Sequence, residues 1–142
     1  MSTQENKRVV LRLFNEAMNN RNLSVVNETF DAHSVHHGFT YPVSGPEGFR
    51  ELLEQFLNGF SDMNIVVEKT VTEDDFVATR GTWTGTHDGD FMGMPSSGKS
   101  VKVGYIDMWR MENGKCVENW VQMDIAGLMQ QVGAKAPAAV EA

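Results

Sequence analysis

The sequence has a single cysteine, Cys116, among its 142 residues. One thiol cannot form an intramolecular disulfide, and it cannot supply a four-thiolate metal site. No stretch approaches the roughly 18 consecutive apolar residues of a membrane-spanning helix, and the N-terminal segment MSTQENKRVV lacks the apolar run of a signal peptide. The sequence therefore predicts neither export nor a membrane partner, and we expect a cytoplasmic protein.

Basic residues are also scarce. Twelve Lys and Arg stand against 19 Asp and Glu, which gives a net charge of −7. That sign repels phosphate backbones, so we expect no nucleic-acid partner. The hydrophobic fraction of 41% and the charged fraction of 22% are typical of a globular chain. At this length about two-thirds of the surface can be buried on folding, which is enough for one domain.

The pattern along the chain favours a single domain over residues 1–133. No internal repeat and no shift in composition marks a second domain. The last nine residues, AKAPAAVEA, follow a glycine and offer little apolar surface for packing. We therefore expect residues 134–142 to be a disordered C-terminal tail.

Helical periodicity dominates the first part of the chain. Ser2 and Glu5 have the spacing of a capping box, and the apolar residues after them recur on one helical face, which predicts a helix over 4–20. A second, short helix is predicted over 24–30. Pro46 in a first turn, followed by an apolar stripe that reaches Phe60, predicts a third helix.

Strand-forming residues dominate after Asp62. The β-branched residues are concentrated at 65–72, 77–86 and 101–106, with turn residues between these runs. Asn113-Gly114 separates two further runs and favours a type I′ hairpin, in which both central residues have positive φ. The sequence therefore predicts an α+β fold, a cone-shaped barrel of N-terminal helices packed into a curved, mostly antiparallel sheet.

The hairpin predicts a register for the last two strands. If Glu112 pairs with Lys115, aromatic and polar side chains share one face: Tyr105, Asp107, Trp109, Glu118, Trp120, Gln122 and Asp124. An aromatic wall suits a small hydrophobic or aromatic ligand, and a carboxyl group whose pKa is raised within such a wall suits proton transfer. The opposite face is also apolar, so we expect a homodimer that forms through the sheet.

Asp124 is the first candidate for that proton transfer. It has a second interpretation, because an aspartate immediately before the helical run IAGLMQQV is a well-suited helix N-cap. Glu118 and Asp107 are weaker candidates, since single carboxylates on sheets are usually surface charges.

The histidines do not predict a metal site. His33, His36 and His37 have a spacing that allows two imidazoles to share a helical face, yet no further ligand type is fixed nearby. His87 lies in a turn-like run, where a hydrogen-bonded histidine is common. Arg80 lies in a predicted strand and would need a carboxylate partner if it pointed inward. No glycine-rich phosphate loop has the required spacing, and we expect neither metal nor cofactor.

A family resemblance is carried by three segments. They are GPEGFRELLEQFLNGFSDM at 45–63, GTHDGDFMGMPSSGK at 85–99 and YIDMWRMENGKCVENWVQMDIAGLMQQVG at 105–133. In order and spacing, these segments resemble the SnoaL-like polyketide cyclases, also called ester cyclases. Ser61 departs from the proline that is usual in this family. The resemblance covers about residues 6–133.

The resemblance implies a fold like that of nuclear transport factor two and ketosteroid isomerase, usually dimeric through the sheet. It also implies ring closure of an aromatic polyketide methyl ester by intramolecular aldol condensation, without cofactor or metal. In this family an aspartate in a Trp-x-x-x-Asp segment acts as acid and base, and Trp120 and Asp124 match that segment. Residues in similar motifs are expected to orient the ligand: His37, Arg80, His87, Trp120 and Gln122. Tyr105 and Trp109 join them as the predicted aromatic lining.

Two alternatives stay open, because one scaffold can host many reactions. The protein could be a non-catalytic module that binds a small molecule, with Asp124 only a helix cap. It could also resemble an epoxide hydrolase, in which Asp107, Arg80 and Asp124 would surround a water molecule.

Overall fold

The N-terminal half of the chain is mostly helical and the C-terminal half is mostly strand. The computed structural model describes residues 2–39 and 41–133. Its elements follow in the order α1 (Thr3–Arg12), the π-helix η1 (Leu13–Asn19), α2 (Ser24–Thr29), β1 (Phe30–His37), β2 (Val43–Ser44), α3 (Gly45–Gly59), β3 (Asn64–Glu73), β4 (Phe76–Thr86), β5 (Ser100–Glu112), β6 (Lys115–Met123) and α4 (Ile125–Gln131). The predicted tail, 134–142, lies outside the described residues.

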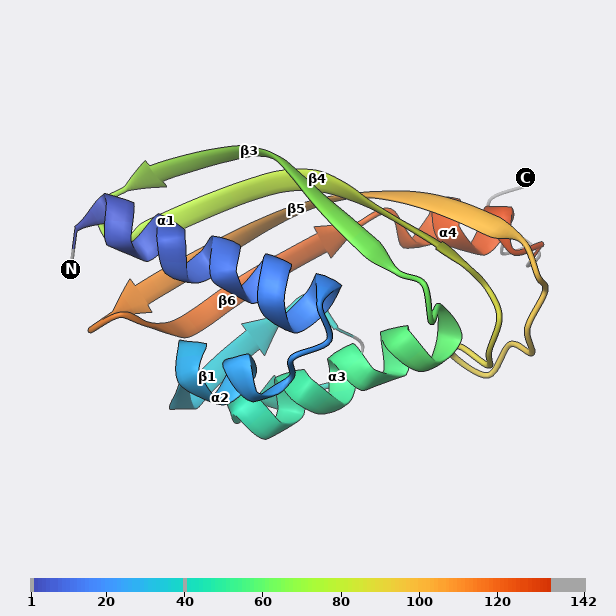
Figure 1. The fold of residues 1–142 in the computed structure, drawn as a ribbon, viewed down its shortest axis with the longest axis horizontal. Helices are drawn as coiled ribbons and strands as arrows, with labels where there is room; N and C mark the ends of the chain where they lie inside the picture. Colours follow the sequence, from blue (N-terminus) through green and yellow to red (C-terminus); the bar gives the residue numbers. More distant parts are fainter. Residues whose placement is uncertain (1, 40, 134–142) are drawn as a thin grey trace.

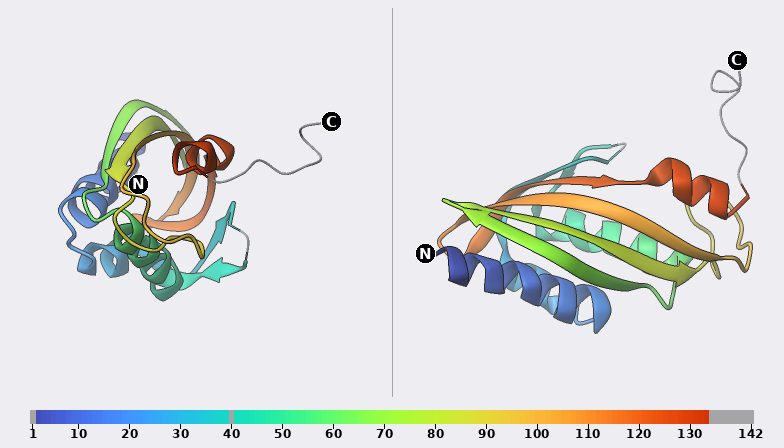
Figure 2. Two further views of the ribbon diagram at one scale, coloured as in Figure 1. Left: turned by 90° about the vertical axis from the view of Figure 1, so that its right-hand side faces the viewer. Right: turned by 90° about the horizontal axis from the view of Figure 1, so that it is seen from above.

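In the described part of the chain, six strands form one sheet in the order β2-β1-β6-β5-β4-β3. Every neighbouring pair is antiparallel except β1 and β6, which are parallel. The long strands curve over α1, η1 and α3, and the end-on view shows the sheet curling around the helices without closing (Figures 1 and 2). The predicted α+β class and the curved, mostly antiparallel sheet are confirmed.

The first helix begins as predicted but changes its winding. The hydroxyl of Ser2 accepts a hydrogen bond from the backbone N–H of Glu5, 3.1 Å away, which is half of the expected capping box. From Leu13 onward the helix is a π-helix, a wide winding that is uncommon and often found at functional sites. It buries four side chains against the sheet: Leu13, Phe14, Ala17 and Met18.

The Asn113-Gly114 hairpin forms as the sequence predicts. Both residues have positive φ, 52° and 78°, and Glu112 pairs with Lys115. The predicted register fails immediately afterwards, because Met111 pairs with Cys116 but Arg110 pairs with Glu118. Val117 is thus an extra residue, a β-bulge that reverses the alternation of β6 relative to β5.

The bulge changes which side chains face the helices. On β5, Tyr105, Asp107 and Trp109 are buried on the concave face, as predicted. On β6 the buried residues are Cys116, Asn119 and Val121. The prediction that Glu118, Trp120, Gln122 and Asp124 share the concave face with Asp107 is wrong, because it assumed unbroken alternation.

Strand β1 was not predicted as a strand. Residues 30–37 form a strand that runs parallel to β6. The short strand β2 pairs with the other side of β1 and forms the edge of the sheet. The polar composition of FDAHSVHH hides its alternation, in which Ser34 and His36 are buried while Val35 and His37 are exposed. Among the described residues, no helix is long and apolar enough to cross a membrane.

Candidate functional site

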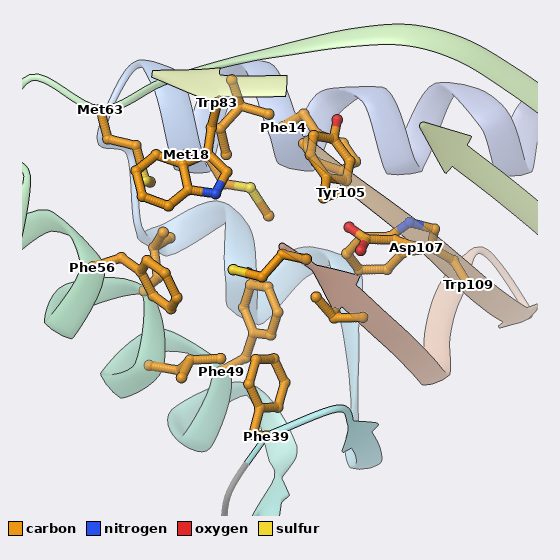
Figure 3. A pocket seen from close by; sticks show the side chains of 15 residues that line it. Phe14, Met18, Phe39, Phe49, Phe56, Met63, Trp83, Tyr105, Asp107 and Trp109 are labelled. Atoms are coloured by element: carbon orange, nitrogen blue, oxygen red, sulfur yellow. The ribbon is translucent and has the colours of Figure 1, made fainter. Parts of the chain in front are cut away.

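A cavity lies between the concave face of the sheet and the helices (Figure 3). Its volume is about 70 Å³. The lining is almost entirely apolar and aromatic: Phe14, Met18, Phe39, Phe49, Leu52, Leu53, Phe56, Met63, Ile65, Trp83, Tyr105, Asp107, Trp109, Val121 and Met123. We call this space the deep chamber.

A second space of about 340 Å³ adjoins the deep chamber and has more exposed lining residues, so we call it the outer chamber. Five residues line both spaces: Phe39, Leu52, Phe56, Val121 and Met123. This outer chamber is bounded by the β4–β5 loop at Phe91 and Met92 and by Ile125 at the start of α4. Its rim includes three exposed apolar side chains, those of Tyr41, Met92 and Ile125.

The lining carries little charge. In the described part of the chain, no lysine, arginine or histidine side chain lines either chamber. An anionic ligand would leave its hydration shell there without gaining a cationic partner, which is costly in an apolar site. The two chambers together are therefore suited to a neutral ligand.

Among the residues that the structure describes, Asp107 is the one carboxyl group in the lining of the deep chamber. It lies on the concave face of β5, where its residue surface is only 6% exposed. Its Oδ1 is buried and has no hydrogen-bond partner among the described residues. Burial raises the pKa of Asp107 to about 8, and a backbone hydrogen bond from Gln122 offsets only part of that shift. Both the neutral and the charged form are thus accessible near neutral pH.

The predicted aromatic residues flank Asp107 on β5. The hydroxyl of Tyr105 lies 3.5 Å from the carbonyl oxygen of Val66, and burial and the charge of Asp107 raise the pKa of this tyrosine. The indole N–H of Trp109 donates to the hydroxyl of Thr79 at 3.1 Å. The structure therefore places both predicted aromatics in the lining, with their polar atoms directed to other protein groups.

Asp124 lies elsewhere. Its exposed carboxylate accepts a hydrogen bond from the backbone N–H of Gly127 at 2.9 Å and caps α4. It lines neither chamber. Of the two interpretations of Asp124 from the sequence, the helix N-cap agrees with this position.

The structure places Trp120 and His37 together on the convex face of the sheet. Their rings stack with centroids 5.3 Å apart, and His37 Nε2 lies 2.7 Å from a carboxylate oxygen of Glu118. Neither ring lines a chamber. Gln122 is also exposed but reaches the rim of the outer chamber.

Arg80 and His87 do not reach the chambers either. Arg80 is exposed on the convex face and pairs with Glu68 at 3.1 Å. His87 is buried, where its ring stacks on Phe60 and its Nδ1 accepts a hydrogen bond from the backbone N–H of Ser97 at 3.2 Å.

Strand alternation also separates the histidines of β1. His36 is buried and its Nδ1 is hydrogen bonded to the side-chain oxygen of Asn119, whereas His37 is on the opposite, exposed face. Among residues 2–39 and 41–133, no group of three His, Cys, Asp or Glu side chains is arranged to hold a metal ion.

Trp83 lines the deep chamber and carries a hydrogen-bond donor, its indole N–H, but the sequence interpretation did not name it as a site residue. It occupies the concave face of β4, where Val77, Thr79 and Gly81 precede it at alternate positions. That period of two was the available signal, since it identifies one buried face of the strand.

The comparisons with known proteins agree with this fold. The sequence profile of the SnoaL-like polyketide cyclase family matches residues 8–132. A candidate SnoaL-like polyketide cyclase from Jannaschia sp. CCS1 has a similar structure, with a TM-score of 0.87 and 27% identity over 94% of this chain and 95% of that one.

Two Streptomyces structures extend this similarity. AclR from Streptomyces galilaeus, a candidate hydroxylase, has a TM-score of 0.85 and 32% identity over 96% of this chain and all of its own, 100%. IdmH from Streptomyces antibioticus, a candidate polyketide cyclase, has a TM-score of 0.79 and 28% identity over 91% of this chain and 99% of its own. No curated protein matches the sequence significantly. The profile match and these structures together show that the chain belongs to the SnoaL-like polyketide cyclase family.

Proposed function

We propose that this protein is a cofactor-independent acid/base enzyme that closes a ring in a small, neutral, hydrophobic carbonyl compound by intramolecular aldol chemistry. The observation that carries the proposal is Asp107, a buried carboxyl group with a pKa raised to about 8 in the wall of an apolar cavity. A group that transfers protons works best when its pKa is near the working pH.

The proposed reaction needs one proton acceptor and one proton donor. The carboxylate of Asp107 removes a proton from an acidified carbon of the substrate, which leaves an enolate. The enolate carbon forms a bond to the carbonyl carbon of the same molecule, and the carbonyl electron pair moves to its oxygen. The neutral Asp107 then returns the proton to that oxygen, so the product is an isomer of the substrate and the enzyme is unchanged.

The shape and polarity of the chambers support this chemistry. A folded, flat substrate would be held between aromatic side chains such as Phe49 and Trp109, which line the deep chamber. Holding both reacting carbons in one cavity removes much of the entropy cost of ring closure. The names of the relatives include both a candidate cyclase and a candidate hydroxylase, so family membership alone does not decide the reaction.

Asp124 is the second candidate for acid/base catalysis because Trp120 and Asp124 match the family motif. Its exposed, capping position supports a structural role instead. For the other motif residues, we propose a ligand-orienting role only where the side chain lines a chamber. Gln122, at the rim of the outer chamber, is the residue that meets this condition.

The test is a screen of neutral aromatic methyl esters that carry an aldehyde or ketone and an acidic carbon. Products are detected by liquid chromatography and mass spectrometry as a new compound of unchanged mass, or of that mass less one water. We expect wild-type protein to convert at least one compound, Asp107→Asn to lose at least about 100-fold in rate and Asp124→Asn to remain active. Full activity of Asp107→Asn would remove this residue from the mechanism.

A non-catalytic binding module is the competing function. It would bind compounds from the same screen without converting any of them, because the apolar chambers need no catalyst to bind. The epoxide hydrolase alternative has less support, since Asp107, Arg80 and Asp124 lie at separate places in the fold.

We further propose a homodimer formed through the convex face of the sheet. This face exposes large apolar side chains from β3 and β5: Val66, Val71, Ile106 and Met108. Met108 lies between Ala78 on β4 and Trp120 on β6, so the apolar surface extends across three strands. Exposed apolar side chains on neighbouring strands are typical of a protein interface.

A further inference from the structure

Trp83 has a buried polar atom that the proposed mechanism leaves unused. The residue is 3% exposed, and its ring packs edge-on against Phe56 and Phe60 with centroids 5.9 and 5.1 Å away. Its Nε1 is buried and has no hydrogen-bond partner among the described residues. A buried donor without a partner destabilises the folded state, so such an atom calls for an explanation.

The other ring donors of the deep chamber are already engaged. Trp109 donates to Thr79, and the Tyr105 hydroxyl turns towards the backbone of β3 at Val66. Gly81 makes room for that turn, because a Cβ there would lie 2.0 Å from the Val66 oxygen and 2.6 Å from the Tyr105 hydroxyl. Among the described residues that line the deep chamber, Trp83 and Asp107 are left with unpaired polar atoms.

These two groups lie at different places in the chamber wall. Trp83 pairs with Val103, which precedes Asp107 by four residues on β5. Four residues of strand span about 13 Å. The backbone positions of Trp83 and Asp107 are therefore about that far apart along the sheet, and the Trp83 indole and the Asp107 carboxyl lie at separate places in the lining (Figure 3). A ligand that met both groups would need an oxygen at each end.

We propose that the indole N–H of Trp83 is a ligand-binding donor, which selects neutral compounds that carry a second acceptor oxygen at the end opposite the one that meets Asp107. This inference rests on the proposed function, because it assumes that a neutral carbonyl compound occupies the deep chamber. Trp83 sets specificity and orientation, since it holds the substrate in the direction that brings its reacting carbons to Asp107.

The test compares two probes that differ by one oxygen. 1,4-Diacetylbenzene has an acceptor oxygen at each end, whereas 4-ethylacetophenone replaces one carbonyl group by a methylene of similar size. We expect wild-type protein to bind the diketone about 6- to 20-fold more tightly than the monoketone. About 2-fold of this ratio comes from the two equivalent orientations of the diketone, and about 3- to 10-fold comes from one additional neutral hydrogen bond. Isothermal titration calorimetry measures both dissociation constants.

Trp83→Phe should reduce this ratio to about 2-fold or less. The matched variant Trp120→Phe, whose ring stacks on His37 and lines neither chamber, should keep the wild-type ratio. The ratio compares the dissociation constants of two ligands for the same variant. A packing defect that weakens the binding of both ligands equally therefore does not change the ratio. In wild-type protein, the diketone should also shift the indole ¹⁵N–¹H signal of Trp83, one of three tryptophans, more than the monoketone does. This NMR measurement serves even if Trp83→Phe fails to fold.

An unchanged ratio in Trp83→Phe, an unperturbed Trp83 signal, or failure of both ketones to bind wild-type protein would each overturn the assignment. These equilibrium outcomes are distinct from failure of the proposed function. If Asp107→Asn retained full turnover, the acid/base role would be lost while the probe ratio still identified Trp83 as a ligand contact.

Discussion

Asp107 on β5 stands opposite Val121 on β6, and both side chains line the deep chamber. Asp107, unlike Asp124, therefore lines the space in which we propose that the ligand binds. This space surrounds the carboxyl with aromatic and aliphatic side chains and leaves one of its oxygens without a partner among the described residues. The proposed chemistry follows from that environment.

Asp107 should make the protein less stable as the pH rises. Its pKa is raised from 3.8 to about 8 in the folded state, so the folded state binds its proton more strongly than the unfolded state. The penalty is absent below about pH 4, grows as the pH rises towards 8 and is then constant; it is on the order of a few kcal/mol. Asp107→Asn should therefore melt at a higher temperature than wild type, with a gap that widens from pH 5 to pH 8.

Thermal unfolding followed by circular dichroism at several pH values measures this gap. Asp75→Asn is the matched control, because Asp75 is an exposed carboxyl at the turn between β3 and β4. A pH-independent difference between Asp107→Asn and wild type would show that the carboxyl is not held neutral by burial.

The rate of the proposed reaction should follow the same ionisation. Because the carboxylate form of Asp107 removes the first proton, kcat/KM should increase with pH and level off above an inflection near 8. Initial rates with any substrate found in the screen give this profile. An inflection near 4 would mean that another group, or an ordinary carboxylate, is the base.

Asp124 should matter for stability but not for turnover. Asp124→Ala removes the hydrogen bond to the Gly127 N–H and should cost about 1 kcal/mol, whereas Asp124→Ser can cap again and should recover most of that loss. Urea unfolding and activity assays of both variants check this. Loss of activity in both variants at retained stability would restore Asp124 as the catalytic candidate.

If the proposed dimer forms, the introduction of charged residues into its interface should lower the mass of the particle in solution. Ile106 is 59% and Met108 is 43% exposed on the convex face, so Ile106→Glu with Met108→Glu would place two carboxylates in the interface. Light scattering should give twice the chain mass for wild type and the mass of one chain, 15.8 kDa, for the double variant. A wild-type mass of one chain would contradict the dimer.

The β5 side of the site was predictable from the sequence because alternation within a single strand is reliable. Tyr105, Asp107 and Trp109 share a face whatever strand lies next to them. The type I′ turn was equally local, since Asn113-Gly114 favours positive φ at both positions.

The β6 side was not predictable, because one extra residue decides it. Val117 is a β-branched residue that fits a regular strand, and nothing in KCVENW marks the bulge. After it, every side chain takes the face opposite to the one expected, which moves Trp120 out and Val121 in. The buried position of Trp83 could have been predicted from the alternation of β4, but its unpaired indole N–H is revealed only by the packed structure.

The most direct test of the account is a titration of the Asp107 carboxyl by ¹³C NMR, with Asp107→Asn used to assign its signal. No substrate is required. We expect a titration midpoint near 8, because the Asp107 carboxyl is buried in the lining of the deep chamber. A midpoint near the ordinary aspartate value of about 3.9 would contradict this expectation, because Asp107 would then be a solvated charge without the proton affinity that the proposed catalysis needs.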